Sequence, residues 1–360
     1  MHLFIALVGL LGLYACDSDD DVIDEDITVN CTPTVGAFTA DGGSMTINVN
    51  ASREWTAFTD ESWISVSLGD ASFDVVVANN TSTQSREGQV TVKAGTERVY
   101  IAITQDGKEE EPVDESIVCP LDGYKLVWND EFDTDGNLSG DWSYQVASPG
   151  WVNNELQTYV EKTSPSGKGV AVVSNGILNI NCFNENGTIY SGRVYAQKKT
   201  GWKYGYFEAS IKLPSGKGSW PAYWMMPVNF TSWPADGEID IMEEVGCNAN
   251  YCSSTVHCNK YNNTNTSIEH AEKKISTAES DFHLYALEWT EDYMTFYQDN
   301  KAILTYKNDG TGKDAWPFNA SFYIILNLAW GGSWGGMYGV DESALPITMQ
   351  VDYVRVFQKK

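Results

Sequence analysis

Hydrophobic and polar residues alternate along much of this chain, and strict alternation predicts β-strands. Between residues 29 and 106 the alternation comes in short runs separated by turn residues, at positions 44–49, 73–78, 89–93 and 99–104. Short strands at this spacing are typical of a small Ig-like β-sandwich. From residue 121 to residue 360 the chain is again rich in strand-forming, glycine and aromatic residues, without a long helical pattern. We therefore predict an all-β protein.

Three segments lack the alternation and divide the chain. Residues 1–15 are apolar but shorter than the about 20 residues that cross a bilayer, so we interpret them as a signal peptide. Residues 16–28 are acidic and predict a tether. Residues 107–120 are charged, contain two prolines and predict a linker between the small sandwich and the domain at 121–360.

One predicted strand, in the stretch 237–245 (GEIDIMEEV), carries acids where a buried strand would carry apolar residues. Side chains alternate between the two faces of a strand, so Glu238 and Asp240 share a face and Glu243 has the wrong parity. A β-bulge near Ile241 and Met242 would return Glu243 to that face, and bulges are common beside active sites. We expect the three acids to line one cleft.

Such a row suits glycoside hydrolysis. Retaining glycosidases need two carboxyl groups about 5–5.5 Å apart, one as nucleophile and one as acid/base. Asp240, placed between Glu238 and Glu243, would push carboxyl pKa values apart through its charge. The alternative is a solvated strand face with Ile239 and Ile241 in the core.

The region from about residue 124 to the C-terminus resembles glycoside hydrolase family 16, the laminarinase-like endo-β-glucanases. The motifs that carry the resemblance are LVWNDEFD (126–133), NNELQ (153–157), SGR (191–193), YGYFEA (204–209), LPSGKGSWPAYWMMP (213–227), FHLYALEW (282–289), FYIILN (322–327) and VDYVRV (351–356). The resemblance implies a β-jelly-roll sandwich and hydrolysis with retention. It also implies that Glu238 is the nucleophile, Glu243 the acid/base and Asp240 the assisting acid.

Further residues match family positions that bind the glycan. Sugars bind to aromatic platforms with a few directed polar groups. The alternatives are ordinary core tryptophans, a surface asparagine, an ion-paired arginine and a hydrogen-bonded core histidine. The candidate substrate-binding residues are Asn154, Arg193, Trp220, Trp224, His257 and Trp334.

The resemblance implies no cofactor for catalysis, and it implies a possible structural Ca²⁺ on the convex face. The family's ligands there are two backbone carbonyls and an Asp, and Glu131, Gly176 and Asp352 match those positions. Oxygen ligands of this kind suit a hard cation.

Net charge bears on the class of substrate, and cysteine content bears on disulfide formation. The chain has 49 acidic and 23 basic residues and a net charge of −26, which disfavours nucleic acid and sulfated polysaccharides but is compatible with a neutral glycan. Seven cysteines are present. A disulfide among Cys247, Cys252 and Cys258 is one interpretation in an exported protein, and reduced buried thiols are the other.

The N-terminal residues suggest a cellular location. Residues 13–16 (LYAC) resemble a lipobox, which would make Cys16 the lipidated N-terminus, although no Lys or Arg precedes the apolar run. The following DSDDD resembles the export signal of Bacteroidetes surface lipoproteins. Residues 29–106 resemble the BACON domain, in which Trp55 and Trp63 are either core residues or a sugar platform.

We therefore expect a monomeric lipoprotein of the outer membrane, facing the cell exterior. Its predicted activity is that of a retaining endo-β-glucanase on β-1,3-glucan (laminarin), mixed-linkage β-1,3-1,4-glucan or both. The alternatives are a family 16 hydrolase of another neutral polysaccharide, such as a galactan, and a surface lipoprotein that binds glycan without catalysis.

Overall fold

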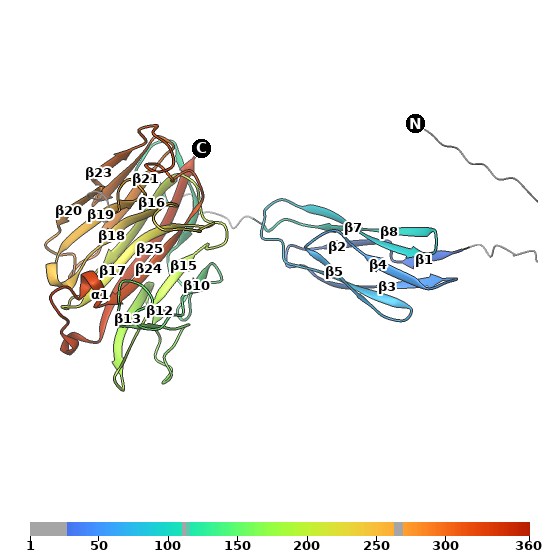
Figure 1. The fold of residues 1–360 in the computed structure, drawn as a ribbon, viewed down its shortest axis with the longest axis horizontal. Helices are drawn as coiled ribbons and strands as arrows, with labels where there is room; N and C mark the ends of the chain where they lie inside the picture. Colours follow the sequence, from blue (N-terminus) through green and yellow to red (C-terminus); the bar gives the residue numbers. More distant parts are fainter. Residues whose placement is uncertain (1–26, 110–113, 115, 263–268) are drawn as a thin grey trace, which may run out of the picture. The chain divides into compact units, whose positions relative to one another are not determined.

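The computed structural model describes residues 27–109, 114, 116–262 and 269–360. The predicted signal peptide, most of the tether and the lipidation residue Cys16 lie outside the described residues. Contacts divide the chain into two compact units, Met1–Pro112 and Val113–Lys360, and each is described by itself (Figure 1). No helix in the described part of the chain has the length and hydropathy that a membrane crossing requires.

The first unit consists of two four-stranded sheets. One has the order β1 (Val29–Thr32), β3 (Gly43–Ala51), β6 (Ser72–Val77) and β5 (Ile64–Leu68), and the other β2 (Val35–Phe38), β8 (Glu97–Gln105), β7 (Arg86–Ala94) and β4 (Trp55–Phe58). Every second residue of these strands enters a common core that includes Ile47, Val75, Val90 and Ile101. The predicted small β-sandwich is confirmed.

Trp55 and Trp63 belong to the packing of this sandwich. The Trp55 ring lies 5.9 Å from the ring of buried Phe73. Trp63 donates its indole N–H to Glu61, and the Arg86 guanidinium lies 4.3 Å above its ring. Because both rings are engaged within the unit, the structure favours the core interpretation over a sugar platform.

The second unit contains a seven-stranded and a ten-stranded sheet. The seven-stranded sheet has the order β10 (Trp142–Tyr144), β15 (Arg193–Ala196), β24 (Phe322–Trp330), β17 (Ser219–Pro227), β18 (Glu238–Glu243), β19 (Tyr251–His257) and β20 (Glu269–Lys274). The ten-stranded sheet has the order β11 (Thr158–Tyr159), β14 (Thr188–Ser191), β13 (Ile177–Glu185), β25 (Ile347–Lys359), β16 (Gly205–Lys212), β21 (His283–Trp289), β22 (Tyr293–Gln298) and β23 (Lys301–Lys307), with β12 (Ala171–Ser174) on β13 and β9 (Tyr124–Asp130) on β25. Short helices lie between strands: η1 (Gly246–Asn248), α1 (Gly332–Gly335) and η2 (Glu342–Ala344).

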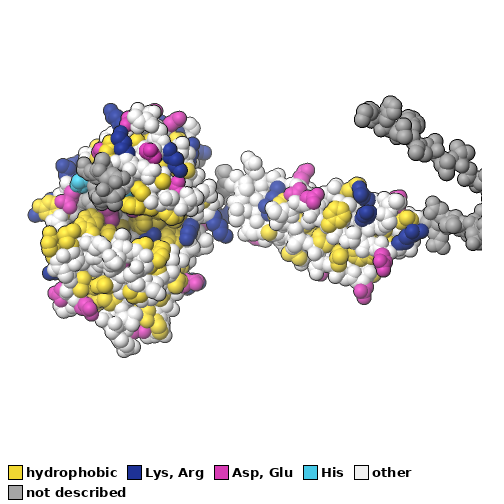
Figure 2. Space-filling view, in the orientation of Figure 1, with side chains coloured by type: hydrophobic (Ala, Val, Ile, Leu, Met, Phe, Trp, Pro, Cys, Tyr) yellow, Lys and Arg dark blue, Asp and Glu magenta, His cyan; other side chains and the backbone are white. Residues whose placement is uncertain are grey.

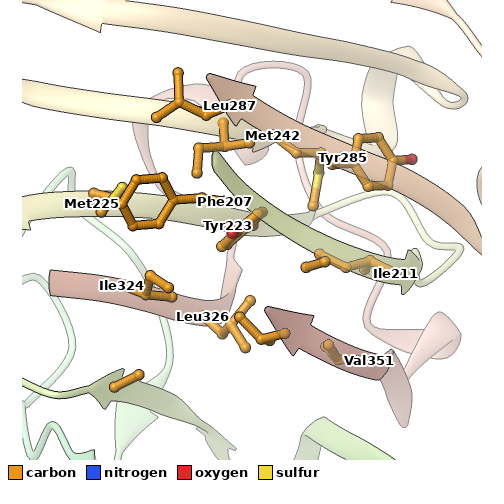
Figure 3. Packing of buried hydrophobic residues seen from close by; sticks show 14 of the residues in the cluster. Phe207, Ile211, Tyr223, Met225, Met242, Tyr285, Leu287, Ile324, Leu326 and Val351 are labelled. Carbon is orange, nitrogen blue, oxygen red and sulfur yellow. The ribbon is translucent and has the colours of Figure 1, made fainter. Parts of the chain in front are cut away.

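The core of this unit lies between the two sheets. Phe207 and Leu287 reach into it from the ten-stranded sheet, and Tyr223, Met225 and Leu326 reach into it from the seven-stranded sheet (Figure 3). All five are fully buried. Alternation on β17 and β24 leaves the opposite face of the seven-stranded sheet free to carry a site. The predicted β-sandwich is confirmed for this unit as well.

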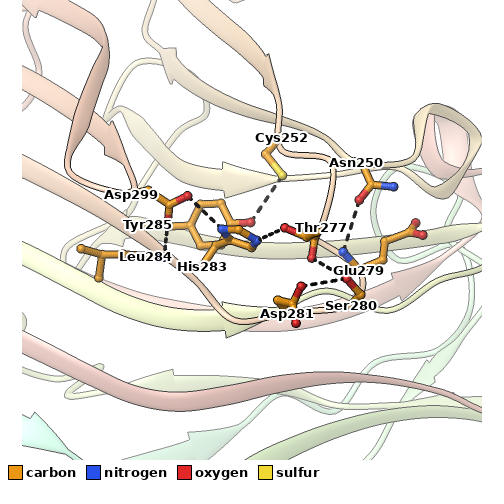
Figure 4. Close-up of polar contacts among 10 residues, drawn as sticks. All are labelled: Asn250, Cys252, Thr277, Glu279, Ser280, Asp281, His283, Leu284, Tyr285 and Asp299. Carbon is orange, nitrogen blue, oxygen red and sulfur yellow. Dashed lines mark hydrogen bonds and ion pairs between the residues drawn. The ribbon is translucent and has the colours of Figure 1, made fainter.

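The six cysteines in the described part of the chain are free thiols. Cys252 and Cys258 point into the core, where Cys252 Sγ lies 3.5 Å from the Tyr285 hydroxyl (Figure 4). These two cysteines are six positions apart on extended chain, about 20 Å, which no disulfide spans. Burial raises the pKa of the Cys252 thiol to about 12, so it stays protonated. The reduced-thiol interpretation therefore holds in this structure.

Candidate active site

A β-bulge in β18 arranges the three acids. Trp224 of β17 pairs with Asp240, whereas the preceding Tyr223 pairs with Met242, so Ile241 is an extra residue on β18. The register with β19 shifts at the same place. The predicted bulge is confirmed, and its effect is that Ile241 and Met242 both enter the core while Glu243 turns back to the face of Asp240.

Glu238, Asp240 and Glu243 line one cleft of about 1000 Å³ on the seven-stranded sheet. Its floor is built from β15, β24, β17, β18 and β19, and loops form its rims. Figure 2 shows hydrophobic side chains along the hollowed face of this unit. A concave, mostly apolar cleft with a few converging polar groups is the usual form of a ligand site.

Asp240 is the buried member of the acidic row, with 2% of its surface exposed. Oxygens of Glu238 and Asp240 and a ring nitrogen of His257 lie within 4.8 Å of one another, and His257 Nε2 is 3.1 Å from Asp240 Oδ2. Burial, and then the charge of Glu238, raise the pKa of Asp240 well above its usual range. The raised pKa favours the protonated form of Asp240, which can donate a hydrogen bond to Glu238.

Two indole groups hold the outer carboxyls. Trp233 Nε1 donates to Glu238 Oε2 at 2.7 Å, and Trp220 Nε1 donates to Glu243 Oε1 at 2.9 Å. Desolvation by the cleft walls, and then the charge of Asp240, raise the pKa of Glu243 well above its usual range, while the Trp220 hydrogen bond acts in the opposite direction. The raised pKa favours the protonated form of Glu243, which is the form that a general acid requires.

The next residue, Glu244, is a second glutamate that the motif alone does not separate from Glu243. It is fully buried, lies outside the cleft lining and accepts a hydrogen bond from the Asn250 backbone N–H. Burial raises the pKa of Glu244 to about 8. Glu243 is therefore the cleft acid, and Glu244 belongs to the packing behind the sheet.

The predicted aromatic residues lie in the cleft. Trp220 and Trp224 share the cleft face of β17, as their spacing predicted, and Trp334 of α1 meets Trp220 edge-on at 5.5 Å. Trp224 Nε1 donates to Asn327 Oδ1 at 2.7 Å, which fixes its ring. His257 also lines the cleft, with its ring 5.7 Å from that of Trp233.

Of the two predicted polar contacts, the structure places one in the cleft. Arg193 lines it, with its guanidinium 4.6 Å above the Trp224 ring. Asn154 does not line the cleft, and its neighbour Asn153 does. Both asparagines have positive φ angles, 51° and 55°, and this left-handed pair directs the Asn154 amide to Ser333 Oγ at 3.3 Å. Asn154 therefore holds the loop that carries Trp334.

Other aromatic residues of the cleft were not predicted. Trp151, Phe230 and Trp233 line it and remain 45–48% exposed, and Met337 is 56% exposed. They stand in loops, where no periodicity marks a residue as functional. The sequence nonetheless held a signal for them. Large apolar residues in a loop rich in Gly, Pro, Ser and Asn cannot enter a core, so they indicate a binding surface.

Paired carboxyls with raised pKa values, in a cleft lined by tryptophans, are typical of a polysaccharide hydrolase. Residues 157–355 match the model of glycosyl hydrolases family 16, and residues 53–106 match the BACON model, whose description is "Putative binding domain, N-terminal". The chain belongs to glycosyl hydrolases family 16. This confirms the resemblance seen in the sequence, the jelly-roll fold and the class of enzyme, which needs no cofactor for catalysis.

Individual relatives agree with the family. A beta-glucanase of Rhodothermus marinus is 40% identical over 248 residues, covering 65% of this chain and 85% of that protein. The crystal structure of SCLam, a non-specific endo-beta-1,3(4)-glucanase, shows 40% identity and a TM-score of 0.62 over 68% of this chain and 94% of that one. The laminarinase structure from Rhodothermus marinus shows 38% identity and a TM-score of 0.62, covering 66% and 98%.

The Trp220 hydrogen bond makes a testable contribution to the pH profile. With Glu243 as the general acid, activity is expected to be lost as pH rises through the pKa of Glu243. In Trp220→Phe the carboxylate loses a donor, so its pKa rises and the alkaline limb of kcat/KM moves up by about one pH unit. The measurement is kcat/KM on laminarin across pH.

The matched control is Trp224→Phe, whose indole N–H binds the Asn327 amide and no carboxylate. We expect this variant to weaken substrate binding without moving the limb. An unmoved limb in Trp220→Phe, or an equal movement in both variants, would contradict the role given to Trp220.

Proposed function

We propose that this protein is a retaining endo-β-1,3(4)-glucanase that hydrolyses β-1,3-glucan, mixed-linkage β-1,3-1,4-glucan or both. The observation that carries the proposal is the bulge in β18, which turns Glu238, Asp240 and Glu243 into one cleft. Support comes from the named relatives, which are beta-glucanases and a laminarinase. The cleft tryptophans match the apolar faces of glucosyl rings.

Each acid has a role that follows from its surroundings. Glu238 attacks the anomeric carbon and forms the bond to the sugar, while Glu243 gives its proton to the departing glycosidic oxygen. Glu243, now a carboxylate, then takes a proton from the water that hydrolyses the glycosyl-enzyme. Asp240 and Trp233 donate hydrogen bonds that orient the Glu238 carboxylate before attack.

Glutamine variants test these roles with two substrates. Both Glu238→Gln and Glu243→Gln should lose laminarin turnover, by at least about 10²–10⁴-fold for the acid/base residue. An aryl β-glucoside oligomer with an acidic phenol leaving group needs no proton, so its bond cleavage should survive in Glu243→Gln and fail in Glu238→Gln.

Wild-type turnover in either variant, or identical behaviour of both on the aryl substrate, would overturn the assignment. Release of reducing sugars by the wild type separates hydrolysis from glycan binding without catalysis. Product analysis over glucans and galactans decides between the proposed substrates and another neutral polysaccharide.

We also propose a structural Ca²⁺ at the junction of β9, β13 and β25. On one side of β25 the pairing with β13 ends at Val351, and the pairing with β9 begins at Val354. If both registers are continued, Gly176 and Glu131 each come to lie opposite Tyr353, next to Asp352.

The side chains at this junction fit the proposed ligand set. Asp352 is the extra residue of a bulge against β16, beside the same junction. The Glu131 carboxylate is bound by Arg355 through two contacts of 2.8 Å, which leaves its backbone carbonyl as the ligand. Two carbonyls and one carboxylate would supply the oxygen atoms that Ca²⁺ prefers, with water completing its shell.

Removal of the metal should lower thermal stability without affecting catalysis. We expect millimolar Ca²⁺ to raise Tm by about 5 °C over EDTA-treated protein, and Asp352→Asn to abolish the difference. Exposed Asp122 provides the control, Asp122→Asn, which should keep the full response. A Tm insensitive to Ca²⁺ in the wild type would contradict the site.

We further propose that the protein acts as a monomer, anchored by lipid on Cys16 and facing the cell exterior. The lipobox-like residues and the acidic stretch after them support the anchor and its orientation. In a Gram-negative host the wild type should fractionate with outer membrane and be cleaved by protease added to intact cells. Cys16→Ala should appear in the soluble fraction, and its retention in the membrane would contradict the anchor.

A further inference from the structure

One end of the cleft is positively charged. Among the described residues, two basic side chains line the cleft: Arg193 of β15 and Lys198 of the turn after it. Neither takes part in an ion pair found in the described part of the chain. In a chain of net charge −26, two cations without a carboxylate partner in one cleft require an explanation.

Both cations lie near the aromatic ring of Tyr195. Lys198 Nζ lies 4.3 Å, and Arg193 Cζ 5.6 Å, from the centroid of Tyr195. Arg193 Nε donates to the Tyr195 hydroxyl at 3.1 Å, and Arg193 is only 8% exposed. The remaining guanidinium nitrogens have no hydrogen-bond partner among the described residues. Loss of hydration, and then the charge of Arg193, lower the pKa of Lys198, and an anion bound to both cations would relieve this repulsion.

The acids of the cleft do not neutralise this end. Glu238, Asp240 and Glu243 stand on β18, three strands from β15, which is about 14 Å at about 4.8 Å per strand. None of the three acids forms an ion pair with Arg193 or Lys198 in the described part of the chain. Glu155 also lines the cleft, but its carboxylate is buried and accepts hydrogen bonds from Gln157 and Tyr159.

The floor beside the cations is apolar. Trp224, Met226 and Val228 of the β17 region pack around buried Tyr195 and Tyr323, and all of them line the cleft. A glucosyl ring on this floor would place its substituents beside Arg193 and Lys198. Arg193 alone can serve a neutral sugar by hydrogen bonding, whereas hydroxyl groups have no need of a second full charge.

We propose that this end of the cleft binds an anionic substituent, a carboxylate or a sulfate ester, on an otherwise neutral β-glucan. The inference rests on the proposed function, because it assigns the substituent to a sugar bound away from the cleaved bond. The net charge of −26 repels heavily charged polymers, so the chemistry fits a sparsely substituted chain, in which one anion meets the two cations.

The test compares neutral laminarin with two sparsely modified forms, one oxidised to carboxylate at C6 and one sulfated, at physiological salt. The measured quantity is the ratio of kcat/KM on modified to neutral glucan. We expect Lys198→Met to lower this ratio about fivefold, mainly through KM, and to change turnover of neutral laminarin less than twofold. Lys198→Glu should lower the ratio further.

Lys199→Met is the matched control, because Lys199 is exposed, adjacent and outside the cleft lining. Its ratio should equal that of the wild type. The proposal is overturned if Lys198→Met leaves both ratios unchanged, if Lys199→Met lowers them equally, or if the wild type rejects both modified glucans. The modified glucan whose ratio falls in Lys198→Met identifies the anion as a carboxylate or a sulfate ester. Failure of the wild type on both neutral laminarin and mixed-linkage β-1,3-1,4-glucan would instead overturn the proposed function.

Discussion

The site depends on a single extra residue in β18. In a regular strand Glu243 would point between the two sheets, where Met242 now lies among fully buried apolar side chains. An ionised carboxylate in that position would cost several kcal/mol. The bulge at Ile241 resolves the conflict, because Ile241 and Met242 both enter the core and Glu243 reaches the cleft. Core packing and the acidic row therefore specify the same backbone irregularity.

Burial then differentiates the three acids. Close carboxyl groups cannot all ionise, and desolvation raises the pKa of both Asp240 and Glu243. Indole N–H groups from β17 and from the loop before β18 fix one oxygen each of Glu243 and Glu238. The same aromatic side chains that would bind sugar thus also position the carboxyls, so substrate recognition and protonation are coupled through shared residues.

Periodicity made part of the structure predictable from the sequence. Strand parity located the bulge and the acids, and a spacing of four placed Trp220 and Trp224 on one face. Loops have no periodic pattern, so Trp151 and Phe230 were not predicted. Asn153 lines the cleft in place of the predicted Asn154 because both residues have positive φ angles, which a sequence motif does not reveal. A disulfide between Cys252 and Cys258 is excluded by geometry, since the two cysteines are six positions apart on extended chain.

Net charge was the least informative part of the sequence, because charges act over a screening length and not over a whole chain. A sum of −26 argues for a neutral substrate only if the acids stand near the substrate. In the structure Glu238, Asp240 and Glu243 stand on β18, and Arg193 and Lys198 stand three strands away, on β15 and the turn after it. A glycan lying across the strands would therefore meet opposite fields at its two ends. Which substituents it can carry is decided by those local fields, whatever the sign of the total.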